Sequence, residues 1–292
     1  MASHRSARIM AAMKAIHPLI DSQELEKQRA SLDMVSILVP PSSKTSCETI
    51  DIGVSCAWLR RKKRRRLGRA VLYLHGGAYI TGSLKYARVI ASRLAGYTGY
   101  DTLALEYRLA PEHPYPAAPD DALMAWEHML SVGYRADKIS VCGDSAGGNL
   151  ALVLALKLRE LGRELPASLV LMSPWGDLSC SGASYTFLKD VDPTTSLEGV
   201  KLAAAMYAAG HPFDHPMLSP LKADFAGFPK TLIQVGTRDL PMSDSLDIAA
   251  KMMNAGVPCD LQIWEGMCHV FQLYPFKESK AAWKKIAAFL LG

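Results

Sequence analysis

Ser145 has the clearest chemical setting in the chain, because it stands at the centre of the single G-x-S-x-G pattern, Gly143–Gly147. Ile139 and Val141, which precede it, are apolar and β-branched as in a buried strand, and the apolar residues after it recur at helical spacing. Glycines around a serine at a sharp strand-to-helix turn let the two elements approach closely and leave the hydroxyl exposed. The pattern predicts a nucleophilic serine.

A serine hydroxyl reacts only when a base takes its proton and an acid orients the base. In a strand–serine–helix architecture these partners follow in the order serine, acid, histidine. Three of the eight histidines follow Ser145. His211 and His215 share a proline-broken loop, which is either an ordinary loop or a metal site. His269 comes directly after the last strand-like run and is the predicted base.

The acid is expected on the loop after the strand that precedes the histidine strand. Asp239 stands there, three residues beyond Gly236 at the end of the run 230–236. Asp244 is the alternative, although Ser243 or Asp244 also suits the N-cap of the following helix. We therefore favour Asp239 as the acid.

The oxyanion formed during acyl transfer needs N–H donors. The sequence YLHGGAY, residues 73–79, places a glycine turn at the end of a strand. We predict that Gly77 and Ala78 are donors together with Ala146, which lies at a helix N-terminus, and that Gly76 supplies flexibility. The turn alone would be an ordinary strand-to-helix turn, but beside a nucleophilic serine it indicates an oxyanion hole.

Strand-like and helical runs alternate along the chain and must position these residues. The strand-like runs are near-continuously apolar, which is typical of a mostly parallel sheet with helices on both faces. They cover 70–75, 101–107, 138–143, 167–173, 230–236 and 259–265, and the helical runs lie near 84–97, 119–132, 146–161, 243–255 and 277–291. Residues 1–45 and 177–225 have helical patterns without strands and are predicted to form a cap over the carboxyl edge of the sheet. We expect residues 1–292 to form a single domain of α/β class.

The net charge of +5 comes from one segment, residues 60–69, which holds 8 of the 33 basic residues; the rest has 25 basic against 28 acidic residues. This basic segment lies between two strand-like runs, where a hairpin turn is expected. It is either a solvated turn or a patch for polyanions, nucleic acid or nuclear import. No aromatic residue interrupts it to stack on bases, so we expect no nucleic-acid partner.

Composition excludes other classes of protein. A chain of 292 residues with 49% hydrophobic content can bury one large core. No apolar run is long enough to cross a bilayer, and Lys14 and His17 interrupt any signal-peptide core, so stable membrane insertion is not expected. Six scattered cysteines without CxxC spacing suit reduced thiols in a cytoplasmic protein.

Five motifs together resemble the hormone-sensitive-lipase-like family of α/β-hydrolases, the bacterial family IV carboxylesterases. They are HGGAY (75–79), YRLAPEHPYPAAPDD (107–121), GDSAGGNLA (143–151), SPWGDLS (173–179) and MCHVFQ (267–272). The similarity covers roughly residues 45–291. Ala78 stands where the family usually has a third glycine.

The resemblance implies an α/β-hydrolase fold and a carboxylesterase for short acyl esters, with Ser145, Asp239 and His269 as the triad and no cofactor or metal. It also implies that Asp144, Asp120 and the segment EYRLAPEHPYP support the site without reacting. The expected partner is a small ester, and the last strand could pair across a homodimer as in some relatives.

Two other functions stay open. Some relatives open lactones or remove acetyl groups from amides with the same triad. Plant gibberellin receptors resemble this family but bind ligand without catalysis, because they lack the histidine. The presence of His269 favours an enzyme.

Overall fold

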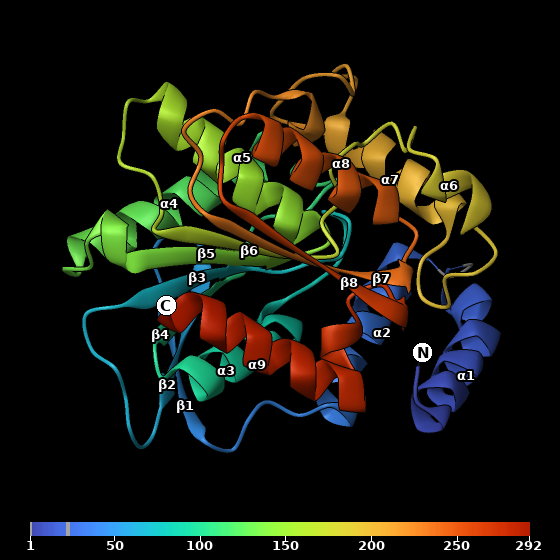
Figure 1. Ribbon diagram of the computed structural model, residues 1–292, viewed down its shortest axis with the longest axis horizontal. Coiled ribbons are helices and arrows are strands. Elements are labelled where there is room, and N and C mark those ends of the chain that lie inside the picture. The colour runs from blue at the N-terminus through green and yellow to red at the C-terminus, as the bar shows by residue number, and fades with distance from the viewer. Residues whose placement is uncertain (1, 22–23) are drawn as a thin grey trace.

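A mixed sheet runs through the computed structural model of the protein, which describes residues 2–21 and 24–292 (Figure 1). The described strands are β1 Thr45–Asp51, β2 Ser55–Arg61, β3 Ala70–Leu74, β4 Asp101–Leu105, β5 Ile139–Asp144, β6 Ser168–Met172, β7 Thr231–Arg238 and β8 Cys259–Cys268. The described α-helices are α1 His4–Asp21, α2 Leu25–Leu38, α3 Leu84–Thr98, α4 Ala117–Ser131, α5 Ala146–Glu160, α6 Ser184–Phe187, α7 Leu197–Ala208, α8 Met242–Asn254 and α9 Lys277–Leu291.

The strands are ordered β1-β2-β4-β3-β5-β6-β7-β8. The pairs β1–β2 and β2–β4 are antiparallel, and all other neighbours are parallel. Every residue of β3, β4 and β6 is buried, which explains why these runs are near-continuously apolar. The predicted mostly parallel sheet is confirmed.

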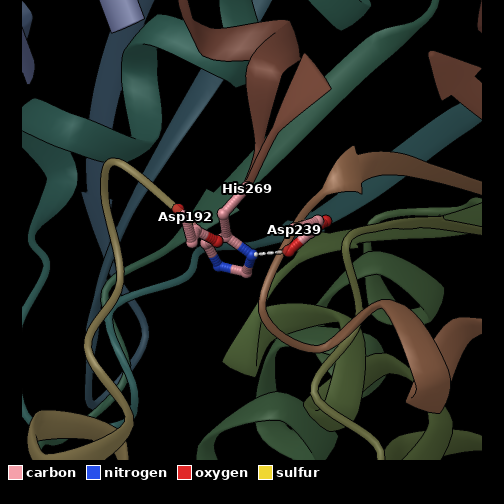
Figure 2. Close-up of side chains that lie close together, drawn as sticks. All are labelled: Asp192, Asp239 and His269. Atoms are coloured by element: carbon pink, nitrogen blue, oxygen red, sulfur yellow. Dashed lines mark hydrogen bonds and ion pairs between the residues drawn. The ribbon is translucent and has the colours of Figure 1, made fainter. Parts of the chain in front are cut away.

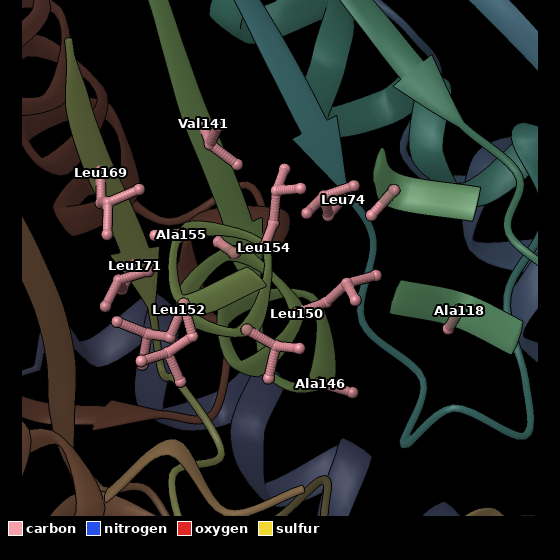
Figure 3. Packing of buried hydrophobic residues seen from close by; sticks show 14 of the residues in the cluster. Leu74, Ala118, Val141, Ala146, Leu150, Leu152, Leu154, Ala155, Leu169 and Leu171 are labelled. Carbon is pink, nitrogen blue, oxygen red and sulfur yellow. The ribbon is translucent and has the colours of Figure 1, made fainter. Parts of the chain in front are cut away.

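Helices cover both faces of the sheet. On one face α4, α5 and α8 pack against inward residues such as Leu72 and Leu171, and on the other α3 and α9 pack against Val71 and Val170. Figure 3 shows Leu150 and Leu154 of α5 in one apolar cluster with Leu74 of β3, Val141 of β5 and Leu171 of β6. This packing fixes the start of α5, which follows Ser145 directly.

The basic segment 60–69 is not a hairpin turn, so that prediction is wrong. Strand β4 lies between β2 and β3, so the segment connects two strands that are not neighbours. Arg65 makes a two-pronged ion pair with Asp101, a buried residue of β4 that also accepts a hydrogen bond from Tyr134 at 2.6 Å. The residues from Lys62 to Gly68 are otherwise exposed. One arginine of this segment is therefore structural.

The two strandless segments lie at the same end of the molecule (Figure 1), where α1 and α2 come from one and α6 and α7 from the other. Residues of α1, α2 and α7 line a common cavity with Ser145, which follows the carboxyl end of β5. None of the helices in the described residues is long and apolar enough to span a membrane.

Candidate active site

Ser145 stands between β5 and α5 with a backbone φ of 54° and ψ of −121°, a conformation that residues other than glycine rarely adopt. Its strain is sustained by close backbone contacts on both sides. A Cβ atom on Gly143 would lie 2.0 Å from the Gly147 carbonyl oxygen, and one on Gly147 would lie 2.1 Å from the Leu74 carbonyl oxygen. The flanking glycines are therefore required by close approach, and the serine is held at a tight turn.

The turn after β3 brings backbone N–H groups to the same place. Gly77 has a φ of 118° and Ala78 a φ of 52°, and both residues line the cavity beside Ser145. Among the described residues, none accepts a hydrogen bond from the N–H of Gly77, Ala78 or Ala146. These three groups are free to donate to an anion, as an oxyanion hole requires.

Gly76 has a different role from the predicted flexibility. Its N–H donates to Asp144 Oδ1 at 3.1 Å, and a Cβ atom there would lie 2.5 Å from Asp144 Oδ2. Asp144 also accepts hydrogen bonds from the hydroxyls of Tyr73 and Tyr86. Burial raises the pKa of Asp144. Asp144 therefore ties the glycine turn to the serine turn.

His269 and Asp239 meet after the ends of β8 and β7, and their side chains are joined by a hydrogen bond of 2.7 Å between His269 Nδ1 and Asp239 Oδ1 (Figure 2). Because an ionised carboxylate only accepts, Nδ1 carries the proton and Nε2 is left as the base. Asp239 is fully buried, whereas 13% of the His269 side chain is exposed and lines the cavity with Ser145. The structure therefore brings the three predicted triad residues to one site.

The charge around His269 favours its protonated form. Burial disfavours the imidazolium, but the carboxyl groups of Asp239, Asp192 and Asp144 together outweigh it and raise the pKa of His269. His75, next to the glycine turn, shows the opposite effect, because burial lowers its pKa to about 4.

The alternative candidates have structural roles elsewhere. Asp244 Oδ2 accepts the N–H groups of Gly176 and Asp177 and the hydroxyl of Tyr185. The N-cap of α8 is Pro241, so the predicted capping by Ser243 or Asp244 is wrong. The His211 ring packs edge-on against Tyr115, and Nδ1 of His215 accepts the N–H of Met217.

The cavity in front of Ser145 has a volume of about 470 Å³ and is mostly apolar. Its walls come from the two strandless segments and include Met13, Leu32, Val35, Val200 and Leu202.

The sequence by itself did not identify Asp192, which lies in the segment between α6 and α7 and is 6% exposed. Asp192 lies beside Asp239 and His269 (Figure 2), and one oxygen or ring nitrogen of each residue lies within 4.8 Å of the other two. Among the described residues, no other group of histidine, cysteine or acidic side chains has the spacing that a metal ion would need. The Asp192 oxygens accept hydrogen bonds from Thr194 and Leu240, and Asp239 accepts from His269 Nδ1. These hydrogen bonds favour an acid–base group over a metal site. An Asp before a proline was the only local signal for Asp192.

The supporting role expected of Asp120 belongs to its neighbour. Asp120 forms a partly exposed ion pair with Lys157 on α5. Asp121 is fully buried, and it binds the guanidinium and the backbone N–H of Arg108 at 2.7–3.0 Å. Asp121 therefore holds the segment that follows β4.

Comparison with known proteins gives concordant results. A family model described as alpha/beta hydrolase fold matches residues 71–273. An acetyl-hydrolase of Streptomyces hygroscopicus is 35% identical over 274 residues, which are 93% of this chain and 89% of the relative.

Two solved structures are similar along almost the whole chain. The structure of an esterase from the bacterial hormone-sensitive lipase family has a TM-score of 0.94 and 34% identity, with 100% of this chain and 99% of the other covered. The structure of EstE5 soaked by p-nitrophenyl butyrate has a TM-score of 0.93 and 32% identity, with coverages of 99% and 98%.

Proposed function

The chain belongs to the hormone-sensitive-lipase-like (bacterial family IV) carboxylesterases of the α/β-hydrolase fold and is a carboxylic ester hydrolase, and from this premise we propose that it cleaves short-chain acyl esters with Ser145, His269 and Asp239 as its triad. The observation that carries the proposal is the hydrogen bond of 2.7 Å between His269 and Asp239, beside a cavity that Ser145 and His269 both line.

In the first half of the reaction, Ser145 Oγ attacks the ester carbonyl carbon while His269 Nε2 takes the hydroxyl proton. The carbonyl oxygen becomes an oxyanion, which the N–H groups of Gly77, Ala78 and Ala146 stabilise. Asp239 holds the imidazole in the required tautomer and stabilises the imidazolium. His269 then gives the proton to the leaving alkoxide, and the alcohol departs from an acyl-enzyme.

In the second half, a water molecule attacks the acyl carbon of the acyl-enzyme. His269 Nε2 takes a proton from this water, and the same three N–H groups bind the second oxyanion. Collapse of the intermediate breaks the bond to Ser145 Oγ and returns the proton to it. The acid product leaves and the site is restored.

The preference for short acyl groups rests on the walls of the cavity. Its apolar lining comes largely from residues 13–38 and 193–203, which close over the serine from two sides. The names of two relatives agree with short chains, since one is an acetyl-hydrolase and the other was soaked by a butyrate ester.

The test is the variant Ser145→Ala on p-nitrophenyl acetate and butyrate, together with labelling by a fluorophosphonate, which marks activated serines. We expect kcat to fall by about a thousandfold or more, because loss of a triad member removes the concerted acid–base step. Labelling should disappear.

Ser140→Ala is the matched control, because Ser140 lies on the same strand, β5, and its hydroxyl is hydrogen-bonded to that of Ser168 across the sheet. It should keep full labelling. Folded Ser145→Ala protein with more than about a tenth of the wild-type kcat would refute the proposed nucleophile. Wild-type protein that binds esters without turnover or labelling would instead point to a binding protein.

A further inference from the structure

Asp192 reaches the triad from a part of the chain that contains none of the reacting residues. It lies on the loop between α6 and α7, within residues 177–225, while Asp239 and His269 follow β7 and β8. Figure 2 shows its side chain beside the His269 ring, with Asp239 on the other side. One oxygen of Asp192, one oxygen of Asp239 and one ring nitrogen of His269 lie within 4.8 Å of one another.

The hydrogen bonds of Asp192 connect this segment to the acid loop. Asp192 Oδ1 accepts the N–H and hydroxyl of Thr194, which fix the carboxyl group on its own loop. Asp192 Oδ2 accepts the N–H of Leu240 at 2.8 Å. Leu240 directly follows Asp239, so this bond reaches the backbone of the acid.

A second bond from the same segment holds Leu240 from its other side. The hydroxyl of Ser184 on α6 donates to the carbonyl of Leu240 at 2.6 Å. By contrast, Asp239 Oδ2 is buried and has no hydrogen-bond partner among the described residues. Asp239 is thus held through the backbone of Leu240, which follows it, whereas its own Oδ2 accepts no hydrogen bond from the described residues.

We propose that Asp192 is a positioning residue of the triad, through which the 177–225 segment holds the Asp239 loop beside His269 and places a second carboxyl group next to the imidazole. This inference rests on the triad proposed above. It assigns to the 177–225 segment a part in assembling the acid–base pair, in addition to lining the cavity.

The groups that face this pair define its charge. The carboxyl groups of Asp239, Asp192 and Asp144 come from three separate segments and favour the protonated form of His269, while the buried Cys268 and Tyr274 stay neutral because burial raises their pKa values. Burial, and then the charge of Asp239, raise the pKa of Asp192 to about 6. Above this pH, ionised Asp192 favours the imidazolium.

Two substitutions distinguish the charge of Asp192 from its hydrogen bond to Leu240. Asp192→Asn removes the negative charge and keeps one oxygen for the Leu240 N–H, while its NH₂ group replaces the oxygen that accepts from Thr194, so the pKa of His269 should fall. We expect the acid limb of kcat/KM to move down by about half to one pH unit, with a smaller loss of kcat at pH 8 than in Asp192→Ala. Asp192→Ala also removes the hydrogen bonds, so kcat should fall about tenfold as the acid loop moves, with KM little changed.

Asp177→Asn is the matched control, since Asp177 is a buried carboxyl group of the same segment whose hydrogen-bond donors include Ser179 and Ser181. It changes the packing of the segment without changing the charge beside His269. The midpoint of its acid limb should therefore equal that of the wild type.

A measurement independent of turnover separates this inference from the proposed function. The His269 imidazole is titrated by NMR in Ser145→Ala protein with and without Asp192→Asn, and its signal is assigned by its loss in His269→Gln. A lower His269 pKa in the Asn protein supports the role of Asp192 even if no ester is cleaved. Equal pKa values with equal acid limbs would overturn it, even if the wild type is a fast esterase.

Discussion

Two carboxyl groups, those of Asp239 and Asp192, lie beside the imidazole of His269, and the charge of Asp144 also favours its protonated form, whereas a serine hydrolase triad needs only one carboxylate. Burial opposes protonation of the ring, and His75 shows the direction of that effect, because burial lowers its pKa to about 4. At His269 the carboxyl groups outweigh burial, and the pKa is raised. Burial at His75 and the carboxyl groups at His269 therefore shift the pKa values of these two histidines in opposite directions.

The pH profile follows from this sign. His269 must be neutral to accept the proton of Ser145, so ester hydrolysis should be lost as the pH falls through its pKa. Because that pKa is raised, we expect the midpoint of the acid limb of kcat/KM to lie above about 6.5, the ordinary value for histidine.

The measurement uses a neutral ester, with circular dichroism at each pH to confirm that the protein stays folded. We do not expect His75 to produce this limb, because burial lowers its pKa to about 4. A midpoint at or below the ordinary histidine value would mean that burial, rather than the carboxyl groups, dominates at His269.

At the level of elements, the site depends on two tight turns at neighbouring strand ends. Strands β3 and β5 are adjacent and parallel, so the glycine turn after Leu74 and the serine turn after Asp144 come to the same edge. Asp144, at the serine turn, accepts a hydrogen bond from the N–H of Gly76 in the glycine turn and so links the two turns. The basic segment precedes β3 and so lies toward the opposite edge of the sheet.

Because of this placement, we expect substitutions in the basic segment to change the free energy of unfolding without changing kcat/KM. Arg65→Ser leaves Asp101, whose side chain is 1% exposed, without its two-pronged partner. We expect the free energy of unfolding to fall by about 1–2 kcal/mol, because Tyr134 and Arg60 still face the buried carboxylate.

Lys63→Ser, at an exposed position of the same segment, is the control and should change stability by less than about 0.5 kcal/mol. Urea unfolding gives both values, and kcat/KM on a neutral ester should be unchanged in both variants. A loss of kcat/KM in the Lys63 variant that does not depend on salt would mean that the segment acts on the site.

For the whole molecule, the segments outside the sheet decide which acyl groups fit. Residues from α1, α2 and α7 close a cavity of about 470 Å³ above Ser145. Met13 on α1 lines this cavity. Met10 instead packs against Met267 and Cys268.

A series of p-nitrophenyl esters from acetate to palmitate tests the depth of this cavity. Each added CH₂ should improve kcat/KM by up to about 0.8 kcal/mol, or about fourfold, while the chain still fits. We expect a maximum between acetyl and hexanoyl esters and little turnover of palmitate. A profile that keeps rising to long chains would indicate an open groove and contradict the short-ester proposal.

Local patterns in the sequence determined much of this protein. The strand–serine–helix turn, the glycine turn and the acid and histidine after two later strands depend on residues a few positions apart. The alternation of strand-like and helical runs was sufficient to predict the parallel sheet and its carboxyl edge, because side-chain periodicity and turn chemistry depend on residues close together in the sequence.

Only the tertiary structure decided which distant residues meet. Strand β4 enters between β2 and β3, and Asp121 rather than Asp120 turns inward to Arg108. Asp192 approaches His269 across 77 positions of sequence, through a loop with no periodic pattern. Such contacts depend on how separate elements pack, and burial then sets the charge state of the groups that packing brings together.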